Sequence, residues 1–270
     1  MKISVIATPT NRILEELKSI HYDGIDLIPS RHFSMPRDLD QQARRDLKAK
    51  INSYNLEIAG LTLATHPSVG LNPVSSIPPE RAESKMYAEE CIRLARDFDV
   101  KVCVYQMGYF HVNMSKDVMW KWNRDALKEL SKTAEDMDVV LAMEFEPLPG
   151  NSLHSADDIV NMIKEVDSAN VRANLDTGHV NILERSGSIV DFVEKLDGNI
   201  AHTHLNDNDG SIDTHSPPGT GNIDWRILLS SLRKAGYSGW FTGEYGYSLK
   251  NAAQSKEVLE KALKYIGGGL

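Results

Sequence analysis

Acidic and histidine side chains end four apolar segments in the second half of the chain. The segments read VVLAMEFEP, VRANLDTGH, IAHTHLNDND and GWFTGEYG, and their polar residues are Glu144 and Glu146, Asp176 and His179, His202 and His204, and Glu244. A carboxylate in an apolar segment is unfavourable unless it is paired, hydrogen-bonded or bound to a metal. The repeated pattern therefore predicts a shared site, provided that the fold brings these segment ends together.

A divalent cation is the simplest partner for such a site. Three carboxylates and an imidazole that converge without a nearby Lys or Arg repel one another, and a bound cation removes the repulsion. Carboxylates with a single imidazole suit Mn²⁺, Mg²⁺ or Co²⁺, whereas additional imidazoles move the preference towards Zn²⁺. The pattern across all four segments favours one ion with the ligands Glu144, Asp176, His204 and Glu244.

Two further residues of these segments have competing interpretations. Glu146 is followed by Pro147, so a loop contact explains it as well as a role in the site does. His202 lies deeper in its segment than His204, and a hydrogen-bonded core histidine explains it better than a metal ligand does.

The elements that must position these residues alternate along the whole chain. Short runs rich in Val, Ile, Thr and aromatic residues predict strands. They span Lys2–Thr8, Gly24–Pro29, Ile58–Thr65, Val100–Met107, Val139–Glu146, Val171–Asp176, Ile200–Leu205 and Trp240–Glu244. Apolar residues at helical spacing predict helices over Asn11–Ile20, Arg81–Phe98, Lys116–Met137, Ser155–Val166, Asp224–Ala235 and Asn251–Ile266.

This alternation predicts parallel strands in an α/β fold. Divided among eight units, the 270 residues give about 34 residues per unit, which suits one βα repeat. We therefore expect a single domain over residues 1–270 that folds as a closed (β/α)8 TIM barrel. An open doubly wound sheet is the alternative. It is disfavoured because ATPTNR, which follows the first predicted strand, lacks a glycine-rich dinucleotide fingerprint.

A barrel would gather the polar residues at one face. The C-terminal ends of its strands meet around one axis, where barrel enzymes keep their active sites. Two long segments, His66–Pro79 and Asn206–Ile223, follow predicted strands and would lie at the same face.

The composition argues against some classes of binding partner and indicates in which compartment the protein is expected. The chain has 30 Lys and Arg against 38 Asp and Glu, and the charge of −8 argues against nucleic-acid or membrane binding through a general basic surface. Cys91 and Cys103 are too few for a disulfide framework and are expected to be buried packing residues. The opening MKISVIATPTN does not read as a signal peptide, and no apolar stretch is long enough for a membrane span. We expect a cytoplasmic protein.

Four stretches of the sequence resemble the xylose isomerase-like barrel superfamily. They are LAMEFEP, NLDTGH, AHTHLNDNDG with the later DTHSPPGTGNIDW, and GYSGWFTGEYG. The resemblance is strong over about residues 139–246 and weaker over the first half. The superfamily holds sugar isomerases and epimerases, inosose and dehydroshikimate dehydratases, and endonuclease IV, so the resemblance is specific to the superfamily and not to one substrate.

The resemblance implies roles for individual residues. In the isomerases and epimerases, strands five to eight supply the four ligands of the metal, which match Glu144, Asp176, His204 and Glu244. His179 matches a histidine that contacts substrate. The other expected substrate contacts are His66, Gln106, Glu146, Asn206, Asp213 and His215. Ketose 3-epimerases carry a Glu and an Arg where this chain has Gly150 and Gly210, which argues against the specific 3-epimerase assignment.

Endonuclease IV, a three-zinc enzyme that acts at abasic (AP) sites in DNA, is the main rival within this superfamily. His66 and the pair Asp213 and His215 resemble its zinc ligands. However, the strand-four position holds Gln106, an amide in place of an imidazole, with His111 five residues further on. No Arg- or Lys-rich loop for gripping DNA stands out at the predicted strand ends.

The expected activity is metal-dependent isomerisation or epimerisation of a small sugar, ketose or sugar derivative. Glu144 and Glu244 would flank the substrate and transfer protons to and from carbon. A dehydratase that uses the same groups, an AP-site endonuclease and a non-catalytic sugar-binding subunit remain alternatives. The expected partner is a small sugar, assembly into a homo-oligomer stays open, and neither nucleic acid nor a membrane is expected.

Overall fold

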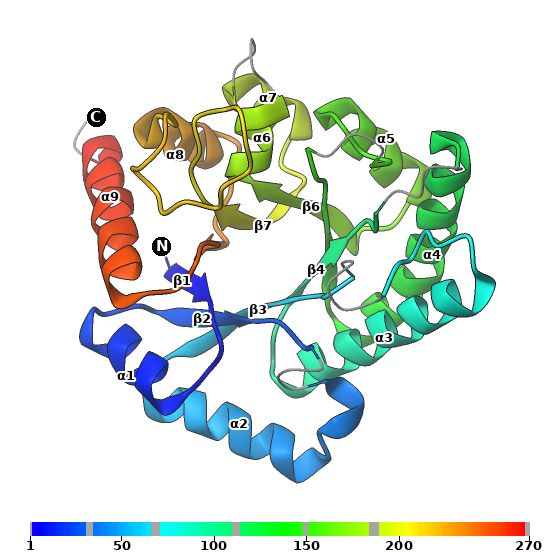
Figure 1. The fold of residues 1–270 in the computed structure, drawn as a ribbon, viewed down its shortest axis with the longest axis horizontal. Helices are drawn as coiled ribbons and strands as arrows, with labels where there is room; N and C mark the ends of the chain where they lie inside the picture. The colour runs from blue at the N-terminus through cyan, green and yellow to red at the C-terminus, as the bar shows by residue number, and fades with distance from the viewer. Residues whose placement is uncertain are drawn as a thin grey trace.

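Eight parallel strands close into a barrel in the order β1 to β8, with β1 paired to β8 (Figure 1). The computed structural model describes residues 2–30, 35–65, 71–109, 114–147, 151–183 and 189–267. The strands are β1 (Lys2–Ile6), β2 (Gly24–Leu27), β3 (Glu57–Thr62), β4 (Val102–Gln106), β5 (Val140–Glu144), β6 (Val171–Asp176), β7 (Ile200–Leu205) and β8 (Trp240–Gly243). The predicted closed (β/α)8 barrel is confirmed, and the open sheet is excluded.

Helices surround the barrel. In the described ranges they are α1 (Asn11–Ser19), α2 (Gln41–Ser53), α3 (Pro78–Asp97), α4 (Lys116–Met137), α5 (Ala156–Val166), α6 (Thr177–Leu183), α7 (Ile189–Leu196), α8 (Trp225–Lys234) and α9 (Leu249–Gly267), with a short 3₁₀ helix over Pro36–Asp38. The last helix, α9, packs against both α8 and α1 and so closes the outer ring (Figure 1).

Six of these helices match predicted ones, whereas α2, α6 and α7 were missed. Helix α2 buries only Ile51, so its sequence lacks a broad apolar stripe. Helices α6 and α7 have 7 and 8 residues, too short for a clear helical period. Six strands end one to three residues before their predicted ends, because those residues leave the ladder and begin the loops.

The register of the barrel brings polar side chains to one level. Gln106 of β4 lies opposite Glu144 of β5, and Asp176 of β6 lies opposite His204 of β7. His204 also lies opposite Thr242 of β8, two residues before Glu244. All these positions are near the C-terminal ends of their strands, as the alternation predicted.

Apolar side chains fill the space between the strands and the helices. Cys91 on α3 and Cys103 on β4 are both buried and free, as expected.

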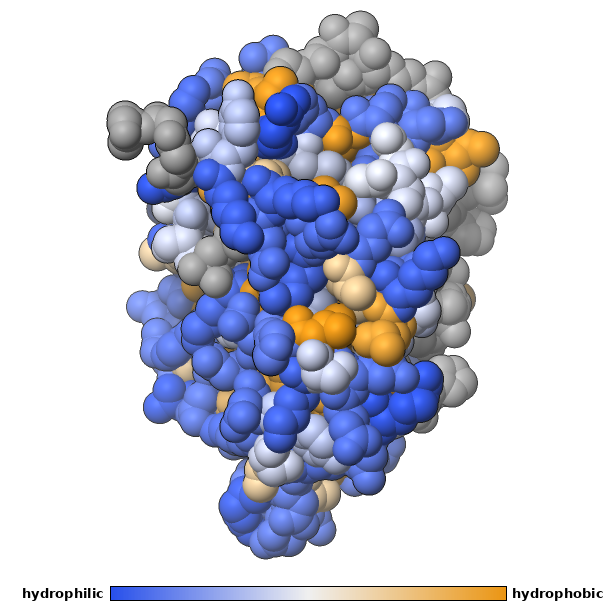
Figure 2. Space-filling model, turned by 90° about the vertical axis from the view of Figure 1, so that its left-hand side faces the viewer, coloured by the Kyte–Doolittle hydropathy of each residue, from blue (hydrophilic) through white to orange (hydrophobic). Residues whose placement is uncertain are grey.

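On the side of the molecule seen in Figure 2, hydrophilic residues cover most of the surface and apolar residues form small separate patches. Within the described ranges, no helix combines the length and apolar character that crossing a membrane requires.

Candidate metal centre and active site

Four side chains converge at the C-terminal end of the barrel. Glu144 and Asp176 are the last residues of β5 and β6, His204 lies one residue before the end of β7, and Glu244 directly follows β8. Each offers a ligand atom, and these four atoms lie within 4.8 Å of one another. Glu144, Asp176 and His204 are buried, and Glu244 retains 16% of its side-chain exposure. The structure thus brings together all four residues predicted as ligands.

His204 lies at the centre of this group. Its Nδ1 is 2.6 Å from Oε1 of Glu144 and 3.0 Å from Oε2 of Glu244. One nitrogen carries at most one proton, so it cannot donate a full hydrogen bond to both carboxylates. Oε2 of Glu244 is accordingly a buried oxygen without a satisfied hydrogen bond. A further hydrogen-bond donor or a cation would satisfy both acids.

Neighbouring amides hold the carboxylates in place. Asn174 on β6 donates to Oε1 of Glu144 at 2.7 Å, and Gln106 faces Oε2 of the same residue at 3.3 Å. Asn206 donates to Oδ2 of Asp176 at 2.8 Å. These amides orient the acids but supply no net charge to balance them.

The three carboxylates of this group favour a bound cation, because nearby side chains do not balance their negative charge. No ion pair among the described residues brings a Lys or Arg to Glu144, Asp176 or Glu244. Burial opposes protonation of His204, but Glu244 and Glu144 outweigh it and raise the pKa of the imidazole well above its usual range. Burial raises the pKa of Asp176 to about 7, an effect that His179 partly opposes. The site draws protons because it holds more negative charge than its side chains can balance.

A divalent metal ion fits this donor set. Three carboxylates and one imidazole offer mainly oxygen ligands, which suits Mg²⁺, Mn²⁺ and Co²⁺, and the imidazole also allows Zn²⁺. The unsatisfied oxygen of Glu244 and the shared nitrogen of His204 are the observations that a bound ion would explain.

His179 on α6 links the acids to the following loop. Its backbone N–H donates to Oδ1 of Asp176 at 2.8 Å, and its Nδ1 donates to the carbonyl oxygen of Phe145 at 2.8 Å. Its Nε2 lies 3.2 Å from Oδ2 of Asp213, an oxygen that also lies 2.9 Å from Nε2 of His215. Both ring nitrogens of His179 are therefore engaged, and a substrate oxygen would have to replace Asp213.

The two histidines and Asp213 form a charged rim. Burial opposes protonation of His215, but its hydrogen bond to Asp213 raises its pKa to about 9. Burial also opposes ionisation of Asp213, and the hydrogen bonds from His179 and His215 lower its pKa below the usual range. Asp213 is thus an ionised group between two imidazoles.

The other residues predicted to contact substrate differ in where they lie relative to the candidate ligands. Glu146 is two residues beyond β5, and burial together with Glu144 raises its pKa. Gln106 and Asn206 touch the candidate ligands themselves. His66, along with His111 and Gly150, lies outside the described residues. At Gly210 the backbone has φ of +82°, a left-handed conformation that suits glycine.

Sequence reasoning missed Asp207, which organises the loop between β7 and α8. The side chain is fully buried, and four N–H groups donate to it. The backbone groups of Asn208 and Ile223 donate to Oδ1 at 3.1 and 3.3 Å, and Oδ2 receives the backbone N–H of Gly219 at 2.8 Å and the indole N–H of Trp225 at 3.0 Å. The sequence signal that could have identified Asp207 is a carboxylate inside the run LNDND, directly after a predicted strand.

The closed barrel and the converging acids define the class of protein. This chain belongs to the xylose isomerase-like TIM barrel family, whose sequence profile matches residues 14–266. The family expected from the sequence resemblance is confirmed.

Three particular proteins illustrate the similarity. The crystal structure of a D-tagatose 3-epimerase-like protein superposes with a TM-score of 0.85 at 26% identity, and 99% of each chain is covered. Fructoselysine 3-epimerase of Shigella flexneri is 24% identical over 237 residues, which is 87% of this chain and 85% of the relative. An uncharacterized protein of Methanocaldococcus jannaschii is 27% identical over 260 residues, 94% of this chain and 84% of that protein.

Proposed function

We propose that this chain, as a single domain over residues 1–270, is a divalent-metal-dependent isomerase or epimerase of a small sugar, ketose or sugar derivative. The observation that carries the proposal is the approach of Glu144, at the end of β5, and Glu244, directly after β8, to the same nitrogen of His204. Two acids in this position can serve a reaction that takes a proton from carbon and returns one. The 3-epimerases among the relatives support the same class of reaction.

Glu144, Asp176, His204 and Glu244 would hold the ion, with Mn²⁺, Mg²⁺ or Co²⁺ as the best match and Zn²⁺ as an allowed one. When bound, the ion would supply Lewis acidity, which polarises the substrate's carbonyl and adjacent hydroxyl oxygens and makes the C–H between them more acidic. All other steps fall to side chains of this chain.

Glu144 and Glu244 are the proposed proton-transfer residues. One carboxylate accepts the proton from the carbon next to the carbonyl, and the electron pair of the C–H bond moves into the substrate as an enediolate. In an isomerisation, the carboxylic acid so formed returns its proton. In an epimerisation, the second Glu starts as a carboxylic acid and delivers its own proton from the other side. Return to the opposite face of the same carbon gives an epimer, whereas return to the neighbouring carbon gives an isomer.

The other side chains would orient the sugar. His179 would bind a substrate oxygen through Nε2, in exchange for its present partner Asp213. Glu146, Gln106 and Asn206 would contact hydroxyl groups near the ion, with Asp213 and His215 at the rim. His66 is proposed as a further contact on sequence grounds.

Turnover of a panel of ketoses by the wild type, with Mn²⁺, Mg²⁺ or Co²⁺ added, tests the proposal. Glu144→Gln and Glu244→Gln should each abolish turnover while leaving the circular dichroism spectrum unchanged. Glu57→Gln is the matched control, because Glu57 is exposed and pairs with Lys2 at the opposite end of the barrel. In D₂O, the substrate should gain deuterium at the reacting carbon.

Three outcomes would overturn the assignment. Full activity in either glutamine variant would remove the proton-transfer role. A product lighter by one water would identify a dehydratase. Nicking of abasic DNA together with three zinc ions per chain would identify an AP-site endonuclease.

A further inference from the structure

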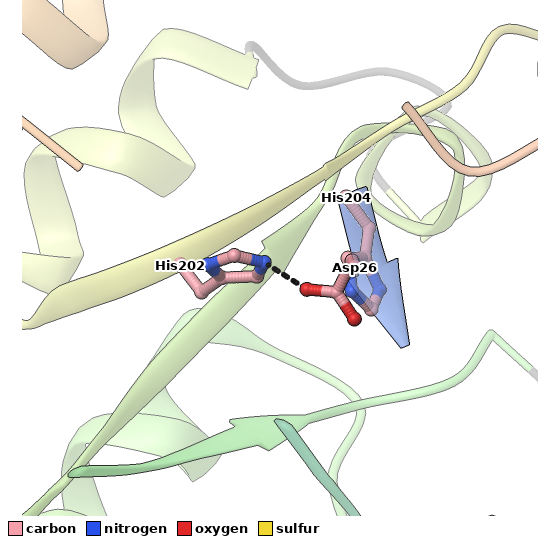
Figure 3. A group of neighbouring side chains, drawn as sticks. All are labelled: Asp26, His202 and His204. Atoms are coloured by element: carbon pink, nitrogen blue, oxygen red, sulfur yellow. Dashed lines mark hydrogen bonds and ion pairs between the residues drawn. The ribbon is translucent and has the colours of Figure 1, made fainter. Parts of the chain in front are cut away.

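A buried chain of polar side chains lies inside the barrel, on the side of His204 away from the acids. Asp26 lies in β2, Thr62 ends β3, and His202 precedes His204 by two residues in β7. Asp26, His202 and His204 are fully buried, and Thr62 is 3% exposed. Figure 3 shows Asp26 facing His202, with His204 beside its carboxylate. The proposed reaction uses neither Asp26 nor Thr62.

The hydrogen bonds in this chain have a definite direction. The Thr62 hydroxyl donates its single proton to Oδ1 of Asp26 at 3.0 Å. Towards Nε2 of His204, at 3.3 Å, the same hydroxyl oxygen can therefore only accept. Nε2 of His204 must carry the proton. In the neutral imidazole, Nδ1 then keeps its lone pair, and it is Nδ1 that faces Glu144 and Glu244.

Asp26 is itself held from two further sides. His202 donates from Nε2 to Oδ2 of Asp26 at 3.1 Å (Figure 3). The same Nε2 lies 3.0 Å from the hydroxyl of Thr242. A Cβ atom placed on Gly60 would lie 2.3 Å from Oδ2 of Asp26, so the carboxylate packs directly on that glycine. Asp26 is thus fixed in the orientation in which it accepts from Thr62. His202 is the core histidine that its sequence position indicated, although its Nδ1 has no hydrogen-bond partner among the described residues.

Asp26, His202 and His204 are also close enough to hold a cation of their own, since their ligand atoms lie within 4.8 Å. The hydrogen bonds argue against this use. Both oxygens of Asp26 already accept protons, and Nε2 of His202 and of His204 both point at hydrogen-bond partners. The nitrogen of His202 that faces Asp26 is Nε2, so the other nitrogen, Nδ1, does not point into this cluster.

We propose that Asp26 and Thr62 are positioning residues for the metal centre, which fix His204 in the tautomer that presents Nδ1 to the ion. The inference rests on the proposed metal site. A metal-bound histidine commonly donates its other N–H to a fixed acceptor, and loss of such an acceptor typically costs 10–100-fold in metal affinity. Here the acceptor is a hydroxyl, which a buried carboxylate orients in turn.

Mn²⁺ binding to the whole protein, measured by equilibrium dialysis with Mn²⁺ alone, tests the inference. Thr62→Val keeps the shape of the side chain but removes the hydroxyl, and it should weaken Mn²⁺ binding by about 10–100-fold. Thr62→Ser restores the hydroxyl and should bind Mn²⁺ close to the wild-type affinity. With diamagnetic Mg²⁺, the imidazole ¹⁵N spectrum should place the His204 proton on Nε2 in the wild type, and Thr62→Val should lose that signature.

Thr203→Val is the matched control. Thr203 is buried in the same barrel, and its hydroxyl donates to the carbonyl oxygen of Trp240 at 2.9 Å, away from His204. This variant should lose stability as Thr62→Val does but keep its Mn²⁺ affinity. A variant that fails to fold would be recognised by circular dichroism. The wild-type ¹⁵N spectrum with Mg²⁺ then decides, because a His204 proton on Nδ1 in place of Nε2 would overturn the inference.

The possible failures are distinguishable. Equal Mn²⁺ affinity in Thr62→Val and the wild type would overturn the positioning role while leaving the metal site intact. Absence of Mn²⁺ binding in the wild type would overturn the proposed metal site and this inference together. Two Mn²⁺ ions per chain, with one lost in His202→Gln, would show that the cluster binds a cation itself.

Discussion

Replacing Asp207 with asparagine should loosen the loop that leads from β7 to α8. Each oxygen of the buried carboxylate accepts two N–H groups, at distances between 2.8 and 3.3 Å. Asparagine keeps one oxygen and replaces the other with an NH₂ group, which is a donor. Two of the four N–H groups then face a donor and lose their acceptor.

The size of the effect follows from these lost bonds. Hydrogen bonds to a charged group contribute about 1.5–3 kcal/mol each, so two lost bonds cost about 3–6 kcal/mol. Asparagine carries no charge, so it escapes part of the desolvation cost of a buried carboxylate, and the lower end of that range applies. A loss of about 3 kcal/mol should lower the melting temperature by roughly 6 °C in a chain of this size.

Thermal unfolding followed by circular dichroism measures this loss. Asp209→Asn is the matched control, because Asp209 is exposed in the same loop and its carboxylate accepts from the backbone N–H and the hydroxyl of the nearby Ser211. The control should shift the free energy of unfolding by less than about 0.5 kcal/mol. Hydrogen exchange of the backbone amides of Gly219 and Ile223 should accelerate in Asp207→Asn alone. Equal melting temperatures in the two variants would refute the role given to Asp207.

Three further predictions address the site and the core. A Cβ at Gly178 would lie 1.9 Å from Oδ1 of Asn206, so Gly178→Ala should displace that amide from the acids and weaken Mn²⁺ binding about tenfold, as read by dialysis. Chelation with EDTA should lower the melting temperature, since an ion at 100 times its dissociation constant stabilises the fold by about 2.7 kcal/mol; no change would argue against the metal centre. Burial raises the pKa of the Cys91 and Cys103 thiols, so fewer thiolates form at a given pH. Iodoacetamide at pH 8 should label neither thiol in the native protein and both after denaturation, by mass spectrometry.

The strands were predictable because each is an apolar run bounded by turn residues. β6 and β7 match their predicted bounds, since Asp176 and Leu205 are followed directly by residues that start a helix or a loop. Helix α2 was missed because tertiary packing, which a single sequence does not show, supports a mostly polar helix that buries only Ile51.

The candidate ligands could be predicted because parallel topology alone brings strand ends together. Asp26 was missed although it interrupts the apolar run GIDLIP, and a buried acid in such a run must find a partner. Its partners lie 36 and 176 positions away in the chain, at Thr62 and His202, so only the closed barrel identifies them. The four donors to Asp207 likewise depend on the path of a loop that no periodicity encodes.

The four candidate ligands lie at the C-terminal ends of four consecutive strands, β5 to β8, with Glu244 directly after β8, and these strands make up one contiguous half of the barrel. The described part of the first half, β1 to β4, forms the opposite wall and contributes none of these four ligands. This division makes the two halves of the chain separable. A chimera that joins β1 to β4 of a relative to β5 to β8 of this chain would change one wall of the pocket and keep all four candidate ligands. Such a chimera must retain Asp26 and Thr62, because His204 on β7 depends on these two residues of the exchanged half, and Gln106, whose amide faces Glu144.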